Sequence, residues 1–302
     1  YVHLRDAVVN DGNTINIGRL TILPLSYIGS PRHMHEYTQD AFAYVRNYGC
    51  PDLFITFTCN PAWVDIKNLL FYGQSPMDRH DITARVFRQK LKSMMEFMIK
   101  YNVFGTVCCW MYSMEWQERG LPHAHILIWL YNKITTSEID EVICAEIPDV
   151  DIDKDLHDVV TKNMIHGPCG ILNPNSPCMK DRKCTKRYPQ ALVSNTATGN
   201  NVYPLYRRRS VENGGKLVTI KMRYGEIEVD NRWVVSYSPL LSKTYKAHIN
   251  VEYCNSVTSV KYICKYVNKG SDMTIFGVQT ERSDKNANIH IDELHSIWRE
   301  DI

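Results

Sequence analysis

The chain has 302 residues, of which 44% are hydrophobic and 23% charged, with a formal net charge of +2. This is ordinary globular composition, sufficient for one large domain or two modest ones. No run of about 18 apolar residues occurs, so we expect no membrane span and no membrane partner. The small net charge does not by itself indicate nucleic-acid binding. The first segment is not a targeting peptide, and because it begins with Tyr1 we expect a piece of a longer protein.

The first half of the chain predicts a helix, a strand, a long helix and two long strands. Residues 38–49 fit a helix, and residues 53–58 (LFITFT) fit a β-branched and aromatic strand. Residues 82–101 carry apolar side chains at helical spacing, with a Met-rich face that we interpret as core. Residues 106–118 and 123–130 predict two strands joined by a turn.

The second half predicts shorter elements around an irregular insert. In chain order we expect helices over 136–146 and 154–165, a Cys/Pro/Gly-rich insert over 166–190, a hairpin over 216–235, a strand over 247–254 and a helix over 257–269. Together these elements predict an α+β fold with a central antiparallel sheet flanked by helices. We expect an N-terminal extension and helix over 1–50, the main domain over 51–275 and a linker over 276–302.

Two histidines on one strand form the first candidate site. His123 and His125 are two residues apart, so on a strand they project from the same face and can bind one metal ion. Glu115 and Gln117 share a face of the preceding strand, and either can add an oxygen ligand. Such a set leaves coordination positions open for a phosphate oxygen. The alternative is a pair of half-buried polar strand residues.

Two tyrosines and a lysine form the second candidate site. In a helix over 257–269, Tyr262 and Tyr266 are stacked on one face, and Lys269 shares that face. Two phenols and an ammonium group suit attack on a phosphodiester, provided that a base, a cation or a metal stabilises phenolate. The alternative is an amphipathic helix with aromatic core residues and a solvated lysine.

Three sequence blocks in combination suggest a family. LFITFTCNPAW (53–63), EWQERGLPHAHILIW (115–129) and YICKYVNKG (262–270) together resemble the replication-initiator-like nuclease domain of Helitron transposases, in the HUH (His–hydrophobic–His) endonuclease superfamily. Residues 18–32 and 248–256 also look like this family, and the resemblance covers roughly residues 15–275. It implies an HUH endonuclease domain over 51–275.

The resemblance also implies a mechanism. His123 and His125 would hold Mg²⁺ or Mn²⁺ against a phosphate of single-stranded DNA, and Tyr262 or Tyr266 would attack it to give a 5′-phosphotyrosine link and a free 3′-OH. Two tyrosines permit two successive nicks, one at each end of a mobile element. Lys269 is a candidate for neutralising charge or orienting a phenol. The choice of third ligand, Gln117 or Glu115, and the order of the tyrosines stay open.

The insert over 166–190 is a separate candidate site. It offers one imidazole and three sulfurs, from His166, Cys169, Cys178 and Cys184. A Pro/Gly-rich loop without a core needs a staple, so we expect a structural Zn²⁺, with free buried thiols as the alternative. The loop is basic, and Lys183 and Lys186 are candidates for DNA phosphate contacts. The other seven cysteines are scattered through apolar segments, typical of small buried residues in a reduced, intracellular protein.

Other candidates for DNA contact are basic and aromatic. Arg207, Arg208 and Arg209 are either a phosphate-contacting patch or a solvated run. Among the tryptophans, Trp63 is the best candidate for base stacking, whereas we expect Trp110, Trp116 and Trp129 to belong to the core. Thr56 and Thr58 either line the histidine site or pair across the sheet.

The resemblance implies partners, and it leaves alternatives. We expect single-stranded DNA at transposon ends as the substrate, a helicase domain C-terminal to this region in the full-length protein, and a nuclear location. One alternative is a related plasmid, phage or conjugative initiator. The other is a catalytically inactive, zinc-stabilised DNA-binding module from a decayed element.

Overall fold

The structure is a computed structural model that describes residues 45–116, 120–198, 204–222, 225–254 and 274–278. Its helices (α, and η for 3-10) and strands (β) are β1 (Leu53–Thr58), α3 (Val64–Lys67), α4 (His80–Lys100), β2 (Val107–Trp116), β3 (Pro122–Leu130), η2 (Thr136–Glu138), α5 (Ile139–Val142), α6 (Lys154–Asn163), β4 (Met179–Lys180), β5 (Lys183–Cys184), η3 (Val211–Asn213), β6 (Val218–Met222), β7 (Gly225–Val229), η4 (Asn231–Trp233), α7 (Pro239–Tyr245), β8 (Ile249–Tyr253) and β9 (Thr274–Val278).

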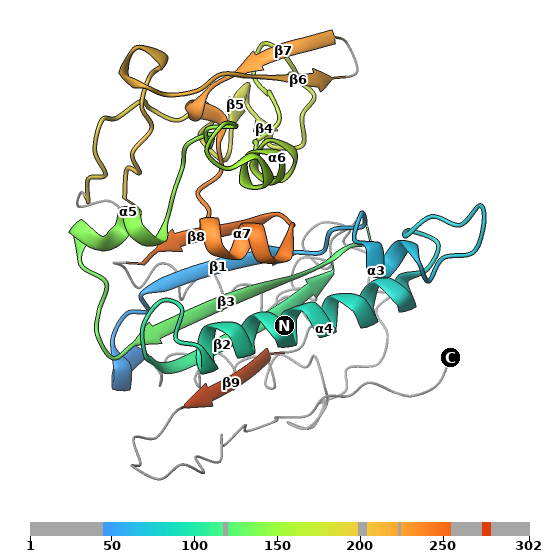
Figure 1. The fold of residues 1–302 in the computed structure, drawn as a ribbon, viewed down its shortest axis with the longest axis vertical. Helices are drawn as coiled ribbons and strands as arrows, with labels where there is room; N and C mark the ends of the chain where they lie inside the picture. The colour runs from blue at the N-terminus through green and yellow to red at the C-terminus, as the bar shows by residue number, and fades with distance from the viewer. Residues whose placement is uncertain (1–44, 117–119, 199–203, 223–224, 255–273, 279–302) are drawn as a thin grey trace, which may run out of the picture.

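A five-stranded antiparallel sheet forms the centre of the molecule, with strand order β8-β1-β3-β2-β9 (Figure 1). The middle strand, β3, is buried along its whole length. Its alternate residues therefore face two covered surfaces, which explains its unbroken apolar run after His125. The fold is α+β, as the sequence predicts.

One face of this sheet carries the main hydrophobic core. The helices α4 and α7 lie against it, in front of the sheet in Figure 1. Alternate residues of β1 and β3 meet the Met-rich face of α4, and representative members of this core are Leu53, Ile55, Phe57, Ala124, Ile126, Phe87, Leu91 and Met94. Burial of this many large apolar side chains fixes which strand face points towards α4, and leaves the alternate residues on the other face.

The chain between β3 and α7 forms a lobe beyond the β8 edge of the sheet (Figure 1). It has a smaller core of its own, made of Ile147, Leu156, Val160, Met164, Val234 and Tyr237. The lobe connects to the sheet through an extended segment, where the backbone N–H of Val251 donates to the carbonyl of Ser236 at 3.0 Å. The predicted insert over 166–190 is thus one part of this larger lobe.

Several sequence predictions agree with the structure. The strands over 53–58, 106–118, 123–130 and 247–254, the helices over 82–101 and 154–165, and the hairpin over 216–235 are present with bounds shifted by a few residues. One prediction is wrong: the helix over 136–146 is only the short pair η2 and α5. Strand β9 includes residues 276–278, at the start of the predicted linker. The predicted helix over 257–269 lies outside the described residues, as does most of the predicted helix over 38–49.

Candidate functional site

Glu115, His123 and His125 come together on the sheet face opposite α4. In the register of β2 and β3, Glu115 lies directly across from His123. His125 is two residues further along β3, so both imidazoles leave the strand on the same side. Their neighbour Ala124 points into the core beneath α4. The sheet geometry therefore gathers two nitrogens and one carboxylate from two adjacent strands.

Gly120 lies in the connection between these two strands, just before β3. Its φ of +73° is in the left-handed region that favours glycine. A Cβ atom at this position would also collide with the imidazole of His80, at the start of α4. The left-handed backbone at this position therefore favours glycine over a residue with a Cβ atom.

The three side chains have the geometry of a metal site. The carboxylate Oε2 of Glu115 is 3.3 Å from Nε2 of His123 and 3.6 Å from Nε2 of His125. All three ligand atoms lie within 4.8 Å of one another. Neighbouring ligands of an octahedral divalent ion are about 3 Å apart at metal–ligand distances of about 2.1 Å, so small movements would seat an ion. Two imidazoles and a carboxylate suit Mn²⁺ and similar borderline ions, and leave positions open.

Strand β1 orients His125 from the other side. The ring nitrogen Nδ1 of His125 is 3.2 Å from the hydroxyl of Thr56, its register partner. A proton on Nδ1 shared with this hydroxyl leaves the lone pair of Nε2 for a metal. Phe54 stacks on the same imidazole, with ring centroids 5.8 Å apart and planes 17° from parallel. Thr56 thus lines the site, which is one of its two predicted roles.

His248 continues the same row of side chains across the sheet. It precedes β8, and its carbonyl accepts a hydrogen bond from the backbone N–H of Thr58, the register partner of His123. Its Nδ1 atom is shielded from water and has no hydrogen-bond partner among the described residues. Burial lowers the pKa of His248 to about 4, so it is a neutral imidazole at neutral pH. In the sequence, the alternation of apolar and polar residues over 247–254 is the signal that could place His248 on this face.

The remaining residues of the predicted catalytic set are not described by the structure. Tyr262, Tyr266 and Lys269 lie outside the described residues, and so does Gln117. Glu115 is therefore the one candidate for the third ligand whose position is known. Ser113 was missed by the sequence analysis, although it is buried on β2 opposite His125.

His166, Cys169, Cys178 and Cys184 form a second cluster in the lobe. The Nε2 atom of His166 is 3.7 Å from the sulfur of Cys169 and 3.6 Å from that of Cys184. All four ligand atoms lie within 4.8 Å of one another. Neighbouring ligands of a tetrahedral zinc ion are about 3.5–3.8 Å apart. The cluster can therefore hold a metal such as zinc, and the residues are those that the sequence predicts.

The surroundings of this cluster favour metal binding further. Burial, with a contribution from Lys186, lowers the pKa of His166, which keeps its lone pair available. Burial alone would raise the pKa of Cys184, but hydrogen bonds from the backbone N–H groups of Tyr188 and Lys186 and from the Cys169 and Cys178 side chains together lower it. Burial and the same neighbouring thiols raise the pKa of Cys169 to about 12, so this ligand needs the metal itself to become a thiolate. The ring of Tyr188 stacks on His166 at 4.1 Å and orients it. Zinc ligands need these neutral imidazole and thiolate forms.

The predicted role of the arginine cluster needs correction. Arg208 is buried, and its guanidinium donates to the carbonyls of Ala145, Asn231 and Val234 at 3.1, 2.7 and 2.7 Å. Arg209 makes a bidentate ion pair with Glu146, and Arg207 is 3.4 Å from the same carboxylate. Arg208 is therefore a buried structural residue and not a phosphate contact, whereas Arg207 and Arg209 stay partly exposed beside Glu146.

The tryptophans also differ from expectation. Trp63 is only 7% exposed, and its indole N–H donates to the carbonyl of Tyr245 at 2.8 Å, so it is not available to stack on a base. Trp110 and Trp129 are in the core, as predicted. Trp116 is 39% exposed at the end of β2, one residue beyond Glu115, and is not a core residue.

Residues 1–128 match the family model described as "Helitron helicase-like domain at N-terminus". This match supports a Helitron-related protein. It indicates a nucleic-acid-acting enzyme whose partner is DNA. A comparison with curated proteins found no match.

The Helitron match includes the whole described metal site but not the lobe. Glu115, His123 and His125 fall within its last residues, and the Cys/His cluster follows about forty positions later. Within the described part of the chain, no helix has the length and apolarity that crossing a bilayer requires.

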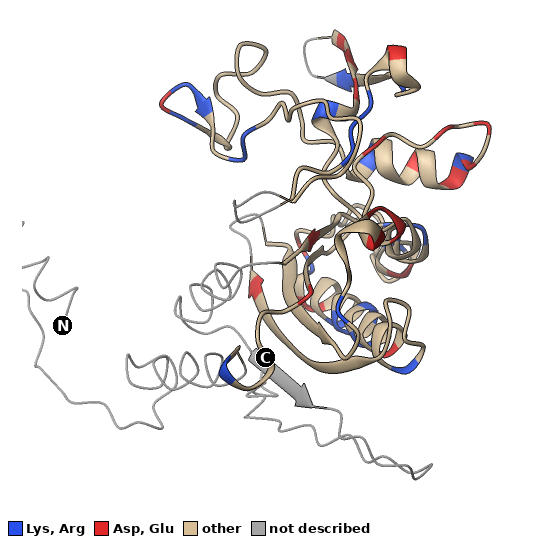
Figure 2. Ribbon diagram, turned by 90° about the vertical axis from the view of Figure 1, so that its left-hand side faces the viewer, with Lys and Arg blue, Asp and Glu red and all other residues tan. Residues whose placement is uncertain are grey.

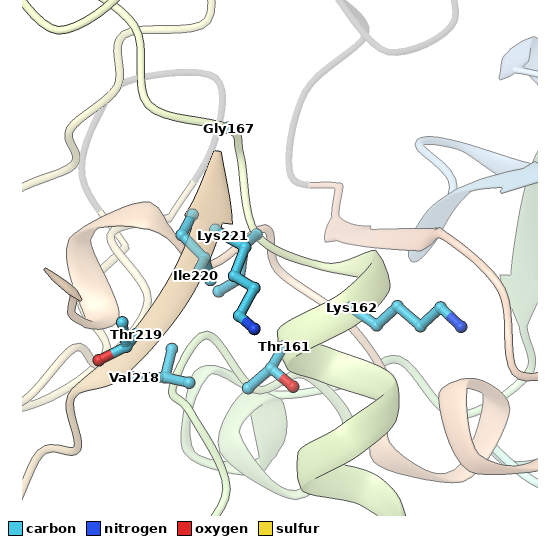
Figure 3. Close-up of a pocket in the computed structure, with 8 residues that line it drawn as sticks. Thr161, Lys162, Gly167, Val218, Thr219, Ile220 and Lys221 are labelled. Carbon is cyan, nitrogen blue, oxygen red and sulfur yellow. The ribbon is translucent and has the colours of Figure 1, made fainter. Parts of the chain in front are cut away.

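The lobe also contains a cleft of about 370 Å³ between α6 and β6. Figure 3 shows Lys221 reaching towards Thr161 across it, above apolar side chains of β6. Ile165 and Gly167 line one wall and flank the candidate zinc ligand His166. Among the described residues, the candidate metal ligands Glu115, His123 and His125 do not line this cleft.

Proposed function

We propose that this protein nicks and rejoins single-stranded DNA through a tyrosine nucleophile and a divalent metal, as HUH endonucleases do in rolling-circle transposition. The observation that carries the proposal is the convergence of Glu115, His123 and His125 on one sheet face, inside the region that matches the Helitron family. A metal-ion site with open positions is what phosphodiester chemistry at neutral pH requires.

Each described residue has a distinct part in this site. His123 and His125 would bind Mg²⁺ or Mn²⁺, and Glu115 would supply the third ligand and one negative charge. Thr56 holds the ring of His125 in the orientation that ligation needs. When bound, the ion supplies Lewis acidity to the scissile phosphate.

The tyrosines lie outside the described residues. The nucleophile is therefore proposed from the resemblance of YICKYVNKG to the family. The phenolic oxygen of Tyr262 or Tyr266 would form a bond to phosphorus as its proton leaves. The bond from phosphorus to the 3′ oxygen breaks, and that oxygen takes up a proton to give the free 3′-OH. Lys269 would offset the phosphate charge. The 5′-phosphotyrosine link retains the phosphodiester energy, so a second strand can be joined without ATP.

The proposal includes partners and a location. The substrates would be single-stranded transposon ends, and a helicase domain C-terminal to this region would supply unwound DNA. The protein would then work in the nucleus. The zinc-bearing lobe would be a structural and DNA-contacting addition, with Lys183 and Lys186 as phosphate contacts, since both are exposed.

A nicking assay tests this proposal. Labelled single-stranded oligonucleotides are incubated with the zinc-loaded protein and Mn²⁺, and products are resolved under denaturing conditions. We expect cleavage that needs Mn²⁺ and that is lost in His125→Ala, whereas Glu228→Gln, on the exposed hairpin of the lobe, keeps it. DNA binding without any cleavage would instead support a zinc-stabilised DNA-binding module.

A further inference from the structure

The segment between the candidate zinc ligands Cys169 and Cys178, here called the zinc loop, presents two large apolar side chains to solvent. Ile171 is 101% exposed and Leu172 is 58% exposed. They follow Cys169 and Gly170, and the backbone N–H of Gly170 contacts the sulfur of Met179 on β4 at 3.3 Å. These side chains gain no burial free energy when the chain folds, and their burial against a partner would be favourable, which suggests a binding role.

Basic side chains surround this apolar tip. The adjacent hairpin formed by β4 and β5 and the residues after it carry five exposed cations against one exposed acid, Asp181; the cations are Lys180, Arg182, Lys183, Lys186 and Arg187. Within the described part of the chain, none of the five makes an ion pair. This contrasts with Arg209, whose charge is neutralised by Glu146. The uncompensated charge fits a polyanion.

The basic hairpin projects on the side of the molecule towards which the histidines face. The helix α4 covers one face of the sheet, in front in Figure 1, and His123 and His125 are on the opposite face. After the turn to Figure 2, the hairpin extends from the lobe on the side away from α4. One nucleic-acid strand that leaves the histidine face can therefore continue towards the zinc loop.

We propose that Ile171 and Leu172 form an apolar wedge that inserts between bases at a junction of single-stranded and double-stranded DNA, while the cations of the hairpin bind the flanking phosphates. Apolar side chains that enter base steps next to phosphate-binding cations are a known way to unstack DNA. A junction is the favoured place, because its terminal base pair has a stacking partner on one side only. The inference rests on the proposed function and specifies its substrate further.

The Cys/His cluster can make this loop rigid enough to act as a wedge. A side chain that separates bases must resist the tendency of those bases to stack on each other again. The four-residue cluster of His166, Cys169, Cys178 and Cys184 fixes both ends of the segment that carries Ile171 and Leu172. With zinc bound, the tip is held by metal–ligand bonds rather than by a hydrophobic core.

The test compares three DNAs of the same sequence: single-stranded, duplex, and a junction with 2-aminopurine at the terminal base pair. The protein is zinc-loaded, and no Mg²⁺ or Mn²⁺ is added, so cleavage does not interfere. We expect the wild-type protein to bind the junction about tenfold more tightly than single-stranded DNA and to increase the 2-aminopurine fluorescence. The variant Ile171→Ser/Leu172→Ser should lose both effects but keep its affinity for single-stranded DNA.

Two control variants make the outcome specific. Phe71→Ser/Tyr72→Ser removes two exposed apolar side chains far along the chain and should leave junction preference unchanged. Lys183→Gln/Lys186→Gln should weaken binding to all three DNAs and reduce its salt dependence.

A wedge variant that keeps junction preference, or a wild-type protein without that preference, would overturn the proposal. So would tight binding to vesicles with anionic lipid that competes with DNA, because a basic surface with an apolar tip is also suited to a membrane. Failure of the nicking assay with junction preference intact would instead count against the proposed catalytic function alone.

Discussion

The carboxylate of Glu115 lies 3.3 Å from Nε2 of His123, its partner across the β2–β3 register. The same oxygen is 3.6 Å from Nε2 of His125. Three ligands thus converge from two strands that the five residues 117–121 join, and one divalent ion could bind all three. This relationship is the basis for the first two predictions.

Glu115→Ala should weaken the binding of Mn²⁺ to the protein. Removal of a ligand should cost at least the roughly 10–100-fold in affinity that removal of an outer-shell partner costs. Isothermal titration calorimetry with the zinc-loaded protein measures this directly. Glu228→Gln is the matched control, since Glu228 lies on β7 away from the site. Equal affinities for Glu115→Ala and Glu228→Gln would show that Glu115 is not a ligand.

Thr56→Val should have a smaller effect on the same titration. It keeps the shape of the side chain but removes the hydroxyl next to Nδ1 of His125, so the imidazole loses its orienting partner. We expect about tenfold weaker binding, within the range of outer-shell partners. If Thr56→Val binds Mn²⁺ as tightly as the wild-type protein, the hydroxyl does not orient His125.

Cys169→Ser should abolish stoichiometric zinc and destabilise the lobe. The remaining imidazole and two sulfurs cannot complete a tetrahedral site, and the loop has few other stabilising contacts. We expect about one zinc per wild-type chain by metal analysis and none in the variant, with a lower melting temperature. Cys108→Ser, on β2, should retain its zinc. This prediction would be contradicted if the wild-type protein contained no zinc and if a chelator left its melting temperature unchanged.

Arg208→Met should lower the free energy of unfolding substantially. The change leaves three carbonyl groups of the lobe without the guanidinium that satisfies them. Removing one partner from such a buried charged network costs about 3–5 kcal/mol. Urea denaturation provides the measurement, and exposed Arg187→Met should change stability by less than about 0.5 kcal/mol. Equal stability of the two variants would argue against a structural role for Arg208.

His248 should make the protein less stable as the pH falls. Its pKa is about 4 in the folded protein because burial disfavours the imidazolium, against 6.5 in an exposed chain. Above pH 6.5 both states are neutral. As the pH falls from 6.5 towards 4, only the unfolded chain takes up the proton, so the free energy of unfolding decreases, by about 3 kcal/mol at most.

The comparison of His248→Gln with the exposed His80→Gln isolates this contribution. Urea unfolding at pH 7 and pH 5 should show a smaller loss of stability in His248→Gln than in the wild-type protein. His80→Gln should behave like the wild-type protein. An unchanged loss in His248→Gln would mean that the imidazole is not held neutral.

The sequence was most informative where side-chain periodicity reflects burial. The strands around His123 and His125 and the Met-rich helix α4 follow from alternation and helical spacing, and the His/Cys spacing led to the lobe cluster. Arg208 was misinterpreted because a run of arginines looks the same whether it meets solvent or carbonyl groups that are distant in sequence. Trp63 was misjudged similarly, since its partner, the carbonyl of Tyr245, is 182 residues away.

Mapping of a covalent protein–DNA product tests the central claim most directly. The zinc-loaded protein is incubated with Mn²⁺ and single-stranded DNA, digested with protease, and the peptide that carries nucleotide is identified by mass spectrometry. We predict nucleotide on the peptide containing Tyr262 and Tyr266, lost in Tyr262→Phe/Tyr266→Phe and in His123→Ala. DNA cleavage that persists in these variants, or nucleotide attached elsewhere, would contradict the account.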